Sequence, residues 1–212
     1  MPEPQDPLPD LSPDGELLIQ LGDPALADPA DHEESERLEA DLEEDLTGDV
    51  DVAVTDLGGR QRQITASLPI ASPPESIWQV LTDYECLAEF IPNLVESAVV
   101  GEEDGCKLVR QVGQQKVMFA KFSATVVLKL EEKYPSQIAF SQHKGDFKIF
   151  AGSWDLIPSK TLATPLTKLS YTLKVLPPRH LPVNWVERRL RRDLSVNLLA
   201  IRERVENIVK QP

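Results

Sequence analysis

The sequence predicts an α+β domain in which one curved antiparallel sheet wraps around a long C-terminal helix. Near the end of the chain, apolar residues recur at spacings of three and four, which places them on one stripe of a helix. These residues are Val186, Leu190, Leu194, Leu198, Ile201, Val205 and Ile208. The chain before this helix alternates between apolar and polar residues in segments separated by short turns, which is typical of antiparallel strands. No crossover helices separate those segments, so a parallel sheet is not expected.

Charge divides the chain into two parts. Residues 1–60 hold 19 acidic residues and two arginines, a net charge of −17, whereas the other 152 residues carry +4. Residues 1–48 are also rich in proline and poor in aromatic residues, so they bury too little apolar surface to offset the entropy of an ordered chain. We therefore expect residues 1–48 to form an acidic disordered tail and residues 49–212 to form one domain. A contact between this tail and the basic residues of the final helix is a further hypothesis.

The predicted domain begins with two alternating segments, at residues 50–54 and 64–70. Each of them presents one apolar face, as a half-buried strand does. The run Asp56-Leu57-Gly58-Gly59 lies between them and offers a turn. We therefore expect this part of the chain to supply the first strands of the sheet.

Two short helices are predicted after these strands. The run Ser72-Pro73-Pro74-Glu75 indicates a helix start, with Ser72 as the capping residue and proline at the first helical position. This helix is expected to end near Leu81. Asp83 is expected to cap a second helix that ends near Phe90, before a proline. Helices this short need a partner, so we expect them to close one end of the sheet.

From residue 95 onward, one predicted strand follows another. Asp104-Gly105 between two alternating segments is a strong signal for a tight hairpin, and Tyr134-Pro135-Ser136 and Gly145-Asp146 offer two further turns. We expect six strands, at about residues 97–102, 107–115, 118–130, 138–144, 147–157 and 166–176. A helix at about residues 182–209 follows them and, at 1.5 Å per residue, extends roughly 42 Å.

Three segments carry a family resemblance: IASPPESIWQVLTDYECLAEFIPN at residues 70–93, GDFKIFAGSWDL at residues 145–156 and ERRLRRDLSVNLLAIRERVE at residues 187–206. They resemble the START-like (SRPBCC) superfamily, also known as polyketide cyclase/dehydrase and lipid-transport proteins. The resemblance covers about residues 50–210, and the coenzyme Q-binding proteins and a ribosome-associated toxin are similar in layout. It implies a helix-grip fold, in which the sheet wraps the final helix and leaves a cavity between them.

The resemblance also implies a set of functions. The leading one is the binding, and transport, of a hydrophobic small molecule such as a lipid or an isoprenoid quinone. A second is a cyclase/dehydrase-type enzyme that acts on an aromatic or polyketide-like substrate, and a third is a ribosome- or protein-interaction module. Because one fold hosts many functions, the fold alone does not choose among the three.

The inward strand faces and the helix stripe supply the candidate ligand contacts, although each residue is also explained as plain core. The candidates are Phe90, Ile91, Arg110, Phe122, Phe140, Tyr171, Leu194, Asn197 and Ile201. Asn197 is a polar residue on the apolar stripe, where an unpaired amide costs about 1–3 kcal/mol, so it is expected to bond a strand carbonyl or the ligand. Arg110 is a candidate for a ligand head group if its strand face is inward and a solvated charge if it is outward. The pattern leaves open whether Trp154 and Phe150 point inward.

Catalysis has little support in the sequence. Asp155 and Tyr171 form the candidate acid–base pair of a cyclase-like pocket, although their spacing does not require that role. His143 lies on the strand face opposite Phe140 and is expected to be exposed. The chain has no metal-ligand spacing and no glycine-rich phosphate loop, so no metal and no cofactor is expected.

The final helix also carries a basic face, formed by Arg188, Arg189, Arg191 and Arg192. Its functional interpretation is contact with anionic lipid headgroups beside the cavity mouth, and its alternative is a solvated face balanced by interleaved acids. No exposed aromatic residues accompany the arginines, which disfavours RNA, and no DNA partner is expected. Two cysteines, the absence of a signal-peptide pattern and the lack of a long apolar run favour a cytoplasmic protein, which we expect to be a monomer.

Overall fold

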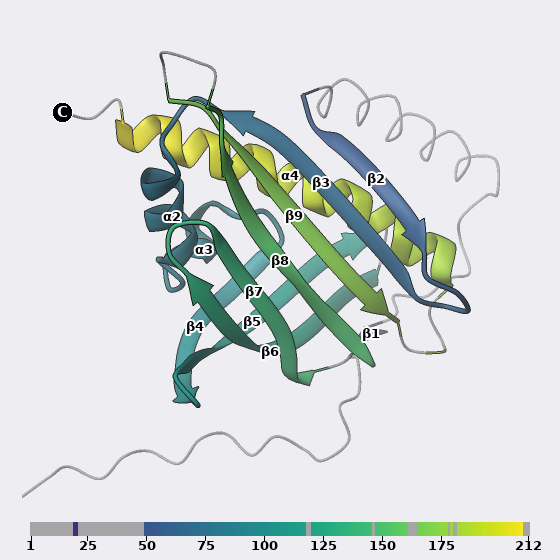
Figure 1. Cartoon of the computed structure of the whole chain (residues 1–212). Coiled ribbons are helices and arrows are strands. Elements are labelled where there is room, and N and C mark those ends of the chain that lie inside the picture. The colour runs from purple at the N-terminus through teal and green to yellow at the C-terminus, as the bar shows by residue number, and fades with distance from the viewer. Residues whose placement is uncertain are drawn as a thin grey trace, which may run out of the picture.

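The computed structural model describes residues 19–20, 49–117, 120–145, 147–160, 165–177, 179 and 182–209. Its elements, labelled in Figure 1, confirm the predicted α+β class and the predicted order. They are β1 (Ile19–Gln20), β2 (Asp51–Asp56), β3 (Arg62–Ile70), α2 (Pro74–Thr82), α3 (Leu87–Phe90), β4 (Leu94–Glu103), β5 (Cys106–Val117), β6 (Ala120–Lys133), β7 (Gln137–Gly145), β8 (Ile149–Pro158), β9 (Thr167–Leu176) and α4 (Val183–Val209).

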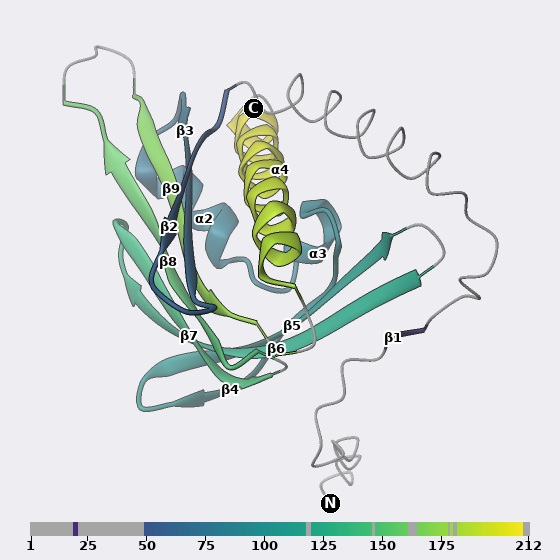
Figure 2. The same cartoon turned by 90° about the vertical axis from the view of Figure 1, so that its right-hand side faces the viewer.

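The strands form one antiparallel sheet in the order β2-β3-β9-β8-β7-β6-β5-β4, with β1 paired to β6. Strands β4 to β9 are consecutive neighbours, and β3 joins the far side of this meander by pairing with β9. Figure 2, which looks nearly along α4, shows the sheet curving around the helix. The predicted helix-grip arrangement is thus confirmed.

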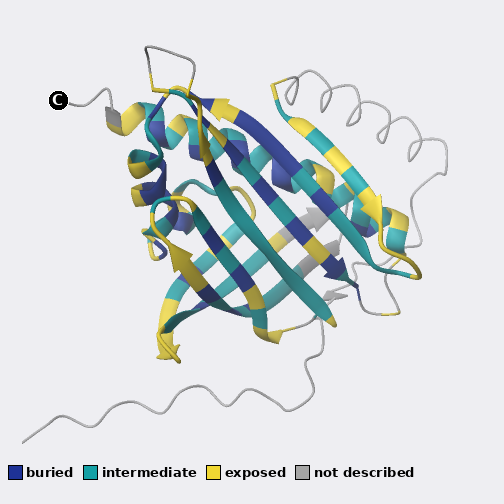
Figure 3. Ribbon diagram, in the orientation of Figure 1, coloured by how far each residue is buried: buried dark blue, intermediate teal, exposed yellow. Residues whose placement is uncertain are grey.

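Alternation of apolar and polar residues along the strands places the core between the sheet and α4. On β3, Ile64 and Leu68 are buried, and on β9, Leu169 and Leu173 are buried, while their neighbours along each strand are more exposed. Figure 3 shows this burial running along β3 and β9 and along the inner side of α4. Most of the helix stripe is buried as predicted, whereas Leu190 is half-buried and Ile208, at its end, is 49% exposed. Helix α4 packs chiefly on β3 and is flanked by α2 and α3.

Two predictions about helix caps are wrong. The residue that caps α2 is Pro73, not Ser72, and it makes no side-chain capping bond. The Ser72 hydroxyl is instead buried with no hydrogen-bond partner among the described residues, while its carbonyl accepts a bond of 2.8 Å from Thr167 Oγ1. Asp83 ends α2 rather than beginning α3, which starts after Cys86. Neither short helix has a side-chain capping bond at its start.

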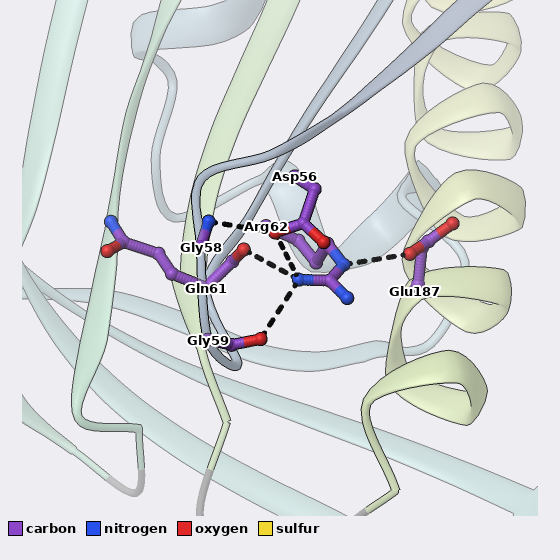
Figure 4. Close-up of polar contacts among 6 residues, drawn as sticks. All are labelled: Asp56, Gly58, Gly59, Gln61, Arg62 and Glu187. Carbon is purple, nitrogen blue, oxygen red and sulfur yellow. Dashed lines mark hydrogen bonds and ion pairs between the residues drawn. The ribbon is translucent and has the colours of Figure 1, made fainter.

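Arg62 fastens the first turns of α4 to the β2–β3 hairpin (Figure 4). Its Nε donates to Glu187 Oε2 on α4 at 3.1 Å, and its Nη1 donates to Asp56 Oδ1 at 2.8 Å. The same Nη1 also donates to the Gln61 carbonyl at 2.9 Å. The Arg62 side chain is only 14% exposed, so these bonds are partly shielded from water. No helix in the described part of the chain is both long and apolar enough to cross a membrane.

Candidate functional site

A cavity of about 300 Å³ lies between the concave face of the sheet and α4. One wall comes from β5 to β9, the opposite wall from α4, and one end from the segment that joins α3 to β4. Most of the described residues that line it are apolar. The cavity exists because the sheet curves away from the N-terminal half of α4, whereas β3 packs closely on the helix.

Five aromatic residues form the sheet wall of the cavity, and we call this group the aromatic wall: Phe140, Phe147, Phe150, Trp154 and Tyr171. The rings of Trp154 and Tyr171 are stacked, with centroids 3.6 Å apart and planes inclined by 19°. The ring centroid of Phe140 lies 6.0 Å from those of both Phe150 and Tyr171, and the centroid of Phe147 lies 5.2 Å from that of Phe150. The wall therefore offers a broad apolar surface of stacked and tilted rings.

Strand register explains why these rings share one face. Directly opposed residues of an antiparallel pair point to the same side of the sheet, and Trp154 opposes Tyr171 while Phe140 opposes Gly152. Gly152 makes room for the Phe140 ring, because a Cβ atom there would lie 2.8 Å from Phe140 Cζ. The same Cβ atom would lie 1.9 Å from the Thr172 carbonyl oxygen. A glycine is therefore required at the centre of the wall.

Helix α4 contributes both apolar and polar side chains to the cavity. Val186, Leu190, Leu194 and Ile201 continue the apolar stripe, and Arg189, Asp193 and Asn197 line the cavity beside it. These three polar residues are four positions apart and so share one side of the helix. Arg189 Nε and Asp193 Oδ1 form an ion pair at 3.4 Å, with side chains 22% and 20% exposed.

Some polar groups that line the cavity have no hydrogen-bond partner among the described residues. Neither the Tyr171 hydroxyl nor the Asn197 side-chain amide forms a hydrogen bond to another described residue, although both residues line the cavity. Burial raises the pKa of Tyr171 above its usual range, and the negative charge of Asp193 raises it further. Tyr171 therefore stays a neutral phenol at physiological pH and offers a hydrogen-bond donor and acceptor.

A second tyrosine lies at the other end of the cavity and is fully partnered. The Tyr84 hydroxyl donates to Glu132 Oε1 at 2.8 Å, and Lys107 Nζ donates to the same oxygen at 2.8 Å. Burial and this bond to Glu132 raise the pKa of Tyr84. Because Glu132 accepts bonds from both Tyr84 and Lys107, these polar groups are already paired within the protein.

A sequence profile identifies the family. The profile described as polyketide cyclase/dehydrase and lipid transport matches residues 70–202. The chain belongs to this family. The match covers most of the domain described above, from the end of β3 into α4. No curated protein matches the chain.

Solved structures show the same fold. An aromatase/cyclase from a Streptomyces species superposes with a TM-score of 0.59 at 20% identity, covering 71% of this chain and 97% of that one. A STAR-related lipid transfer protein from Xanthomonas axonopodis gives 0.59 at 14% identity, covering 74% and 94%. A human lipid transfer and protein localization domain gives 0.56 at 12% identity, covering 80% and 94%. At these identities the likeness establishes the fold of this family member.

Most of the predicted ligand contacts lie at the cavity. These are Ile91, Phe140, Tyr171, Leu194, Asn197 and Ile201. Phe90 is not among the lining residues, and its ring lies 5.5 Å from the guanidinium carbon of Arg204. The side chain of Phe122 lies outside the described part of the structure, as does the tail at residues 1–18 and 21–48. Contact of any of these residues with a ligand stays a prediction.

Arg110 does not lie at the cavity. The inward face of β5 carries Val109 and Gln111, so Arg110 is on the outer face, where it pairs with Glu96. The sequence pattern left this open, because Leu108 and Val112 give the outer face an apolar appearance. Arg110 is therefore a charge on the outer face of the sheet, which is the second of the two alternatives, and it is not part of the candidate site.

Asp155 also lies outside the cavity. It opposes Ser170, while its neighbour Trp154 opposes Tyr171, so Asp155 and Tyr171 are on opposite faces of the sheet. Its carboxylate accepts bonds from Gln137 Nε2 at 2.7 Å and Ser153 Oγ at 2.6 Å. The two residues therefore cannot act as an acid–base pair in one pocket.

The basic face of α4 is narrower than predicted. Arg189 lines the cavity, whereas Arg188 and Arg191 are exposed and Arg192 is half-buried.

Several cavity residues were missed or left undecided from sequence, namely Tyr84, Gln111, Phe147, Phe150, Trp154, Arg189 and Asp193. Trp154 was recoverable, because pairing it with the inward Tyr171 fixes its direction. No group of three or more His, Cys, Asp or Glu side chains in the described chain is placed to hold a metal ion.

Proposed function

We propose that this family member binds a hydrophobic small molecule between the sheet and α4 and carries it without chemical change. The aromatic wall is the observation that carries this proposal, because five rings face a cavity of about 300 Å³. Ligand sites are typically apolar and aromatic cavities of about 300–1,000 Å³ with a few placed polar groups. The Tyr171 hydroxyl and the Asn197 amide are such polar groups, and both lack a partner among the described residues.

The size and shape of the cavity limit the ligand. Its volume is at the lower end of the range for small-molecule sites. This favours a compact ring system, such as a quinone head group or a fused aromatic compound, over a lipid with two acyl chains. Flat rings stack well on aromatic side chains, which prefer offset-stacked or edge-to-face contacts.

The cyclase-type alternative rests on Tyr171, since Asp155 is on the other face of the sheet. A general base is ionised before it accepts a proton, and the raised pKa of Tyr171 keeps its hydroxyl protonated. Asp193 is the one carboxylate among the described lining residues, and it is paired with Arg189. The cavity thus favours binding, while proton donation by Tyr171 keeps the enzyme as the second candidate.

Native mass spectrometry of the purified full-length chain tests the proposal. We expect one apolar compound for each chain, recovered unchanged by extraction into organic solvent. A chain that is empty after purification and that takes up no aromatic compound contradicts it. If the recovered compound changes mass on incubation with the wild type but not with Tyr171→Phe, the chain is an enzyme instead.

Ligand exchange at membranes is the finer part of the proposal, and the exposed Arg188 and Arg191 support it. Each basic residue near an anionic surface contributes about 1 kcal/mol to attraction. The double variant Arg188→Gln, Arg191→Gln should therefore sediment less with vesicles that contain phosphatidylserine. The double variant Arg202→Gln, Arg204→Gln, at the far end of α4, is the control. Equal sedimentation of wild type and the first variant contradicts membrane exchange, and co-sedimentation with ribosomes points to an interaction module.

A further inference from the structure

The cavity holds one positive and one negative charge, and the two are paired with each other. Among the described lining residues, Arg189 and Asp193 are the ones with a formal charge. Their separation of 3.4 Å makes an ion pair, while Arg189 Nε has no hydrogen bond of good geometry. The charges of the described lining residues therefore cancel, so this lining is electrically neutral without any ligand.

A neutral cavity responds differently to neutral and anionic ligands. A carboxylate that enters it adds a negative charge near Asp193. The positive charge of Arg189 is already balanced by Asp193, so it does not offset the charge of the ligand. Like charges brought together in a site shielded from water are strongly unfavourable. A hydroxyl or carbonyl group brings no such cost and can bond the polar groups that are present.

The field of Asp193 reaches across the cavity to the sheet. Tyr171 stands on β9, and the charge of Asp193 contributes to raising its pKa. A ligand that lies against the aromatic wall therefore also lies within the field of Asp193. Tyr171 itself stays uncharged and adds no compensating charge for an anion.

The polar side chains also form a row. Arg189, Asp193 and Asn197 are four residues apart, so successive members are about 6 Å apart along α4. They face the aromatic wall across the cavity. A ring compound that stacks on the wall can turn its oxygen substituents toward this row, where Asp193 accepts from a hydroxyl and Asn197 can donate or accept.

We propose that the cavity selects uncharged ring compounds that bear hydroxyl or carbonyl groups and rejects carboxylates such as fatty acids, and that Asp193 sets this selection. The inference rests on the proposed function, because it concerns the ligand of the same cavity. It adds a ligand class and names the residue responsible for it. Neither the aromatic wall nor the volume of the cavity makes this distinction.

Naphthol and naphthoate test the proposal, because they share a ring system and differ in charge at neutral pH. Their binding to the full-length chain is followed by calorimetry and by the fluorescence of Trp154 and Trp185, which both line the cavity. We expect the wild type to bind naphthol at least about tenfold more tightly than naphthoate. In Asp193→Asn, which leaves Arg189 uncompensated, naphthoate should gain about tenfold or more while naphthol changes less than about threefold.

Asp155→Asn is the matched control, because it removes a carboxylate on the outer face of the sheet. It should leave both affinities unchanged. Arg189→Gln is a second variant that decides the matter if Asp193→Asn does not fold. It removes the positive charge that is paired with Asp193, so naphthoate should bind even more weakly than to the wild type.

The outcomes separate this inference from the proposed function. Equal wild-type affinities for the two compounds overturn the inference and leave the binding function intact. An Asp193→Asn chain that is folded and shows the wild-type ratio does the same. Binding of neither compound to any folded variant overturns both the inference and the proposed function.

Discussion

The indole ring of Trp154 lies on the phenol ring of Tyr171, with centroids 3.6 Å apart and planes inclined by 19°. The two residues are direct partners across β8 and β9. A stacked aromatic pair contributes about 0.5–1.5 kcal/mol beyond the area that it buries. The stack therefore fixes the Tyr171 ring at the cavity wall before any ligand arrives, which lowers the entropic cost of binding.

Tyr171→Phe should separate ligand binding from folding. The Tyr171 hydroxyl has no hydrogen bond to another described residue, so its removal should change the free energy of unfolding by less than about 0.5 kcal/mol. The stack on Trp154 is retained. Naphthol binding should weaken about fivefold, the equivalent of one hydrogen bond of about 1 kcal/mol. Urea denaturation and calorimetry measure the two effects, and a large loss of stability with unchanged affinity contradicts the prediction.

Asn197→Leu should stabilise the ligand-free protein. The amide lines a mainly apolar cavity and has no hydrogen bond to another described residue. A leucine has the same number of side-chain heavy atoms as asparagine and is apolar throughout, so unfolding should cost about 0.5–1.5 kcal/mol more. Affinity for an oxygen-bearing ligand should fall at the same time. Thermal denaturation with and without naphthol gives both quantities, and an unchanged affinity removes Asn197 from the site.

Gly152→Ala should damage the aromatic wall. The added Cβ atom would lie 1.9 Å from the Thr172 carbonyl oxygen and 2.8 Å from Phe140 Cζ, so β8 and β9 would have to separate. We expect a loss of about 3 kcal/mol or more in the free energy of unfolding, measured by urea denaturation. Gly101→Ala is the control, because its nearest contact would be Leu108 Cδ1 at 4.0 Å. A loss of similar size in both variants would contradict the prediction, because the steric clash exists at Gly152 and not at Gly101.

Much of the fold follows from periodicity in the sequence. On α4, the apolar stripe from Val186 to Val205 predicts a single buried face. The alternation on β3 and β9 does the same for each strand. The Asp104-Gly105 hairpin is confirmed as well, with φ angles of 52° and 75° that suit a tight two-residue turn. These features are local, so each can be recognised from a few neighbouring residues.

The cavity depends on which strands pair and on how the sheet curves. Neither can be predicted from the periodicity of the sequence. Strand β8 carries apolar residues on both faces, so the direction of Trp154 is decided by its partner Tyr171. Arg189 and Asp193 flank the apolar stripe and would be solvated if the sheet packed closely along all of α4. Because the sheet curves away there, the inward side of the helix is wider than the stripe, and both charges line the cavity.

Arg62→Ala should loosen the first turns of α4. Arg62 bonds Glu187 on the helix and Asp56 on the hairpin, and its side chain is only 14% exposed. Hydrogen bonds to charged groups contribute about 1.5–3 kcal/mol, so we expect a loss of about 2 kcal/mol in urea denaturation. Arg204→Ala, which removes an exposed pair with Glu89, should cost less than about 1 kcal/mol. Equal losses in the two variants contradict the view that burial makes the bonds of Arg62 stronger than the exposed pair of Arg204.

Tyr84 should make the protein less stable in alkali. Its folded pKa is raised by burial and by the bond to Glu132, whereas in the unfolded chain it is about 10. A raised folded pKa gives stability that is complete below about pH 10 and is lost as the pH rises above that value. Urea denaturation at neutral pH and at about pH 11 measures this loss. Tyr84→Phe should lower stability at neutral pH, because the bond to Glu132 is gone, yet show a smaller further loss in alkali. Tyr134→Phe, at a residue that is 67% exposed, should keep the wild-type loss of stability in alkali. An equal alkaline loss in the Tyr84 variant contradicts the assignment.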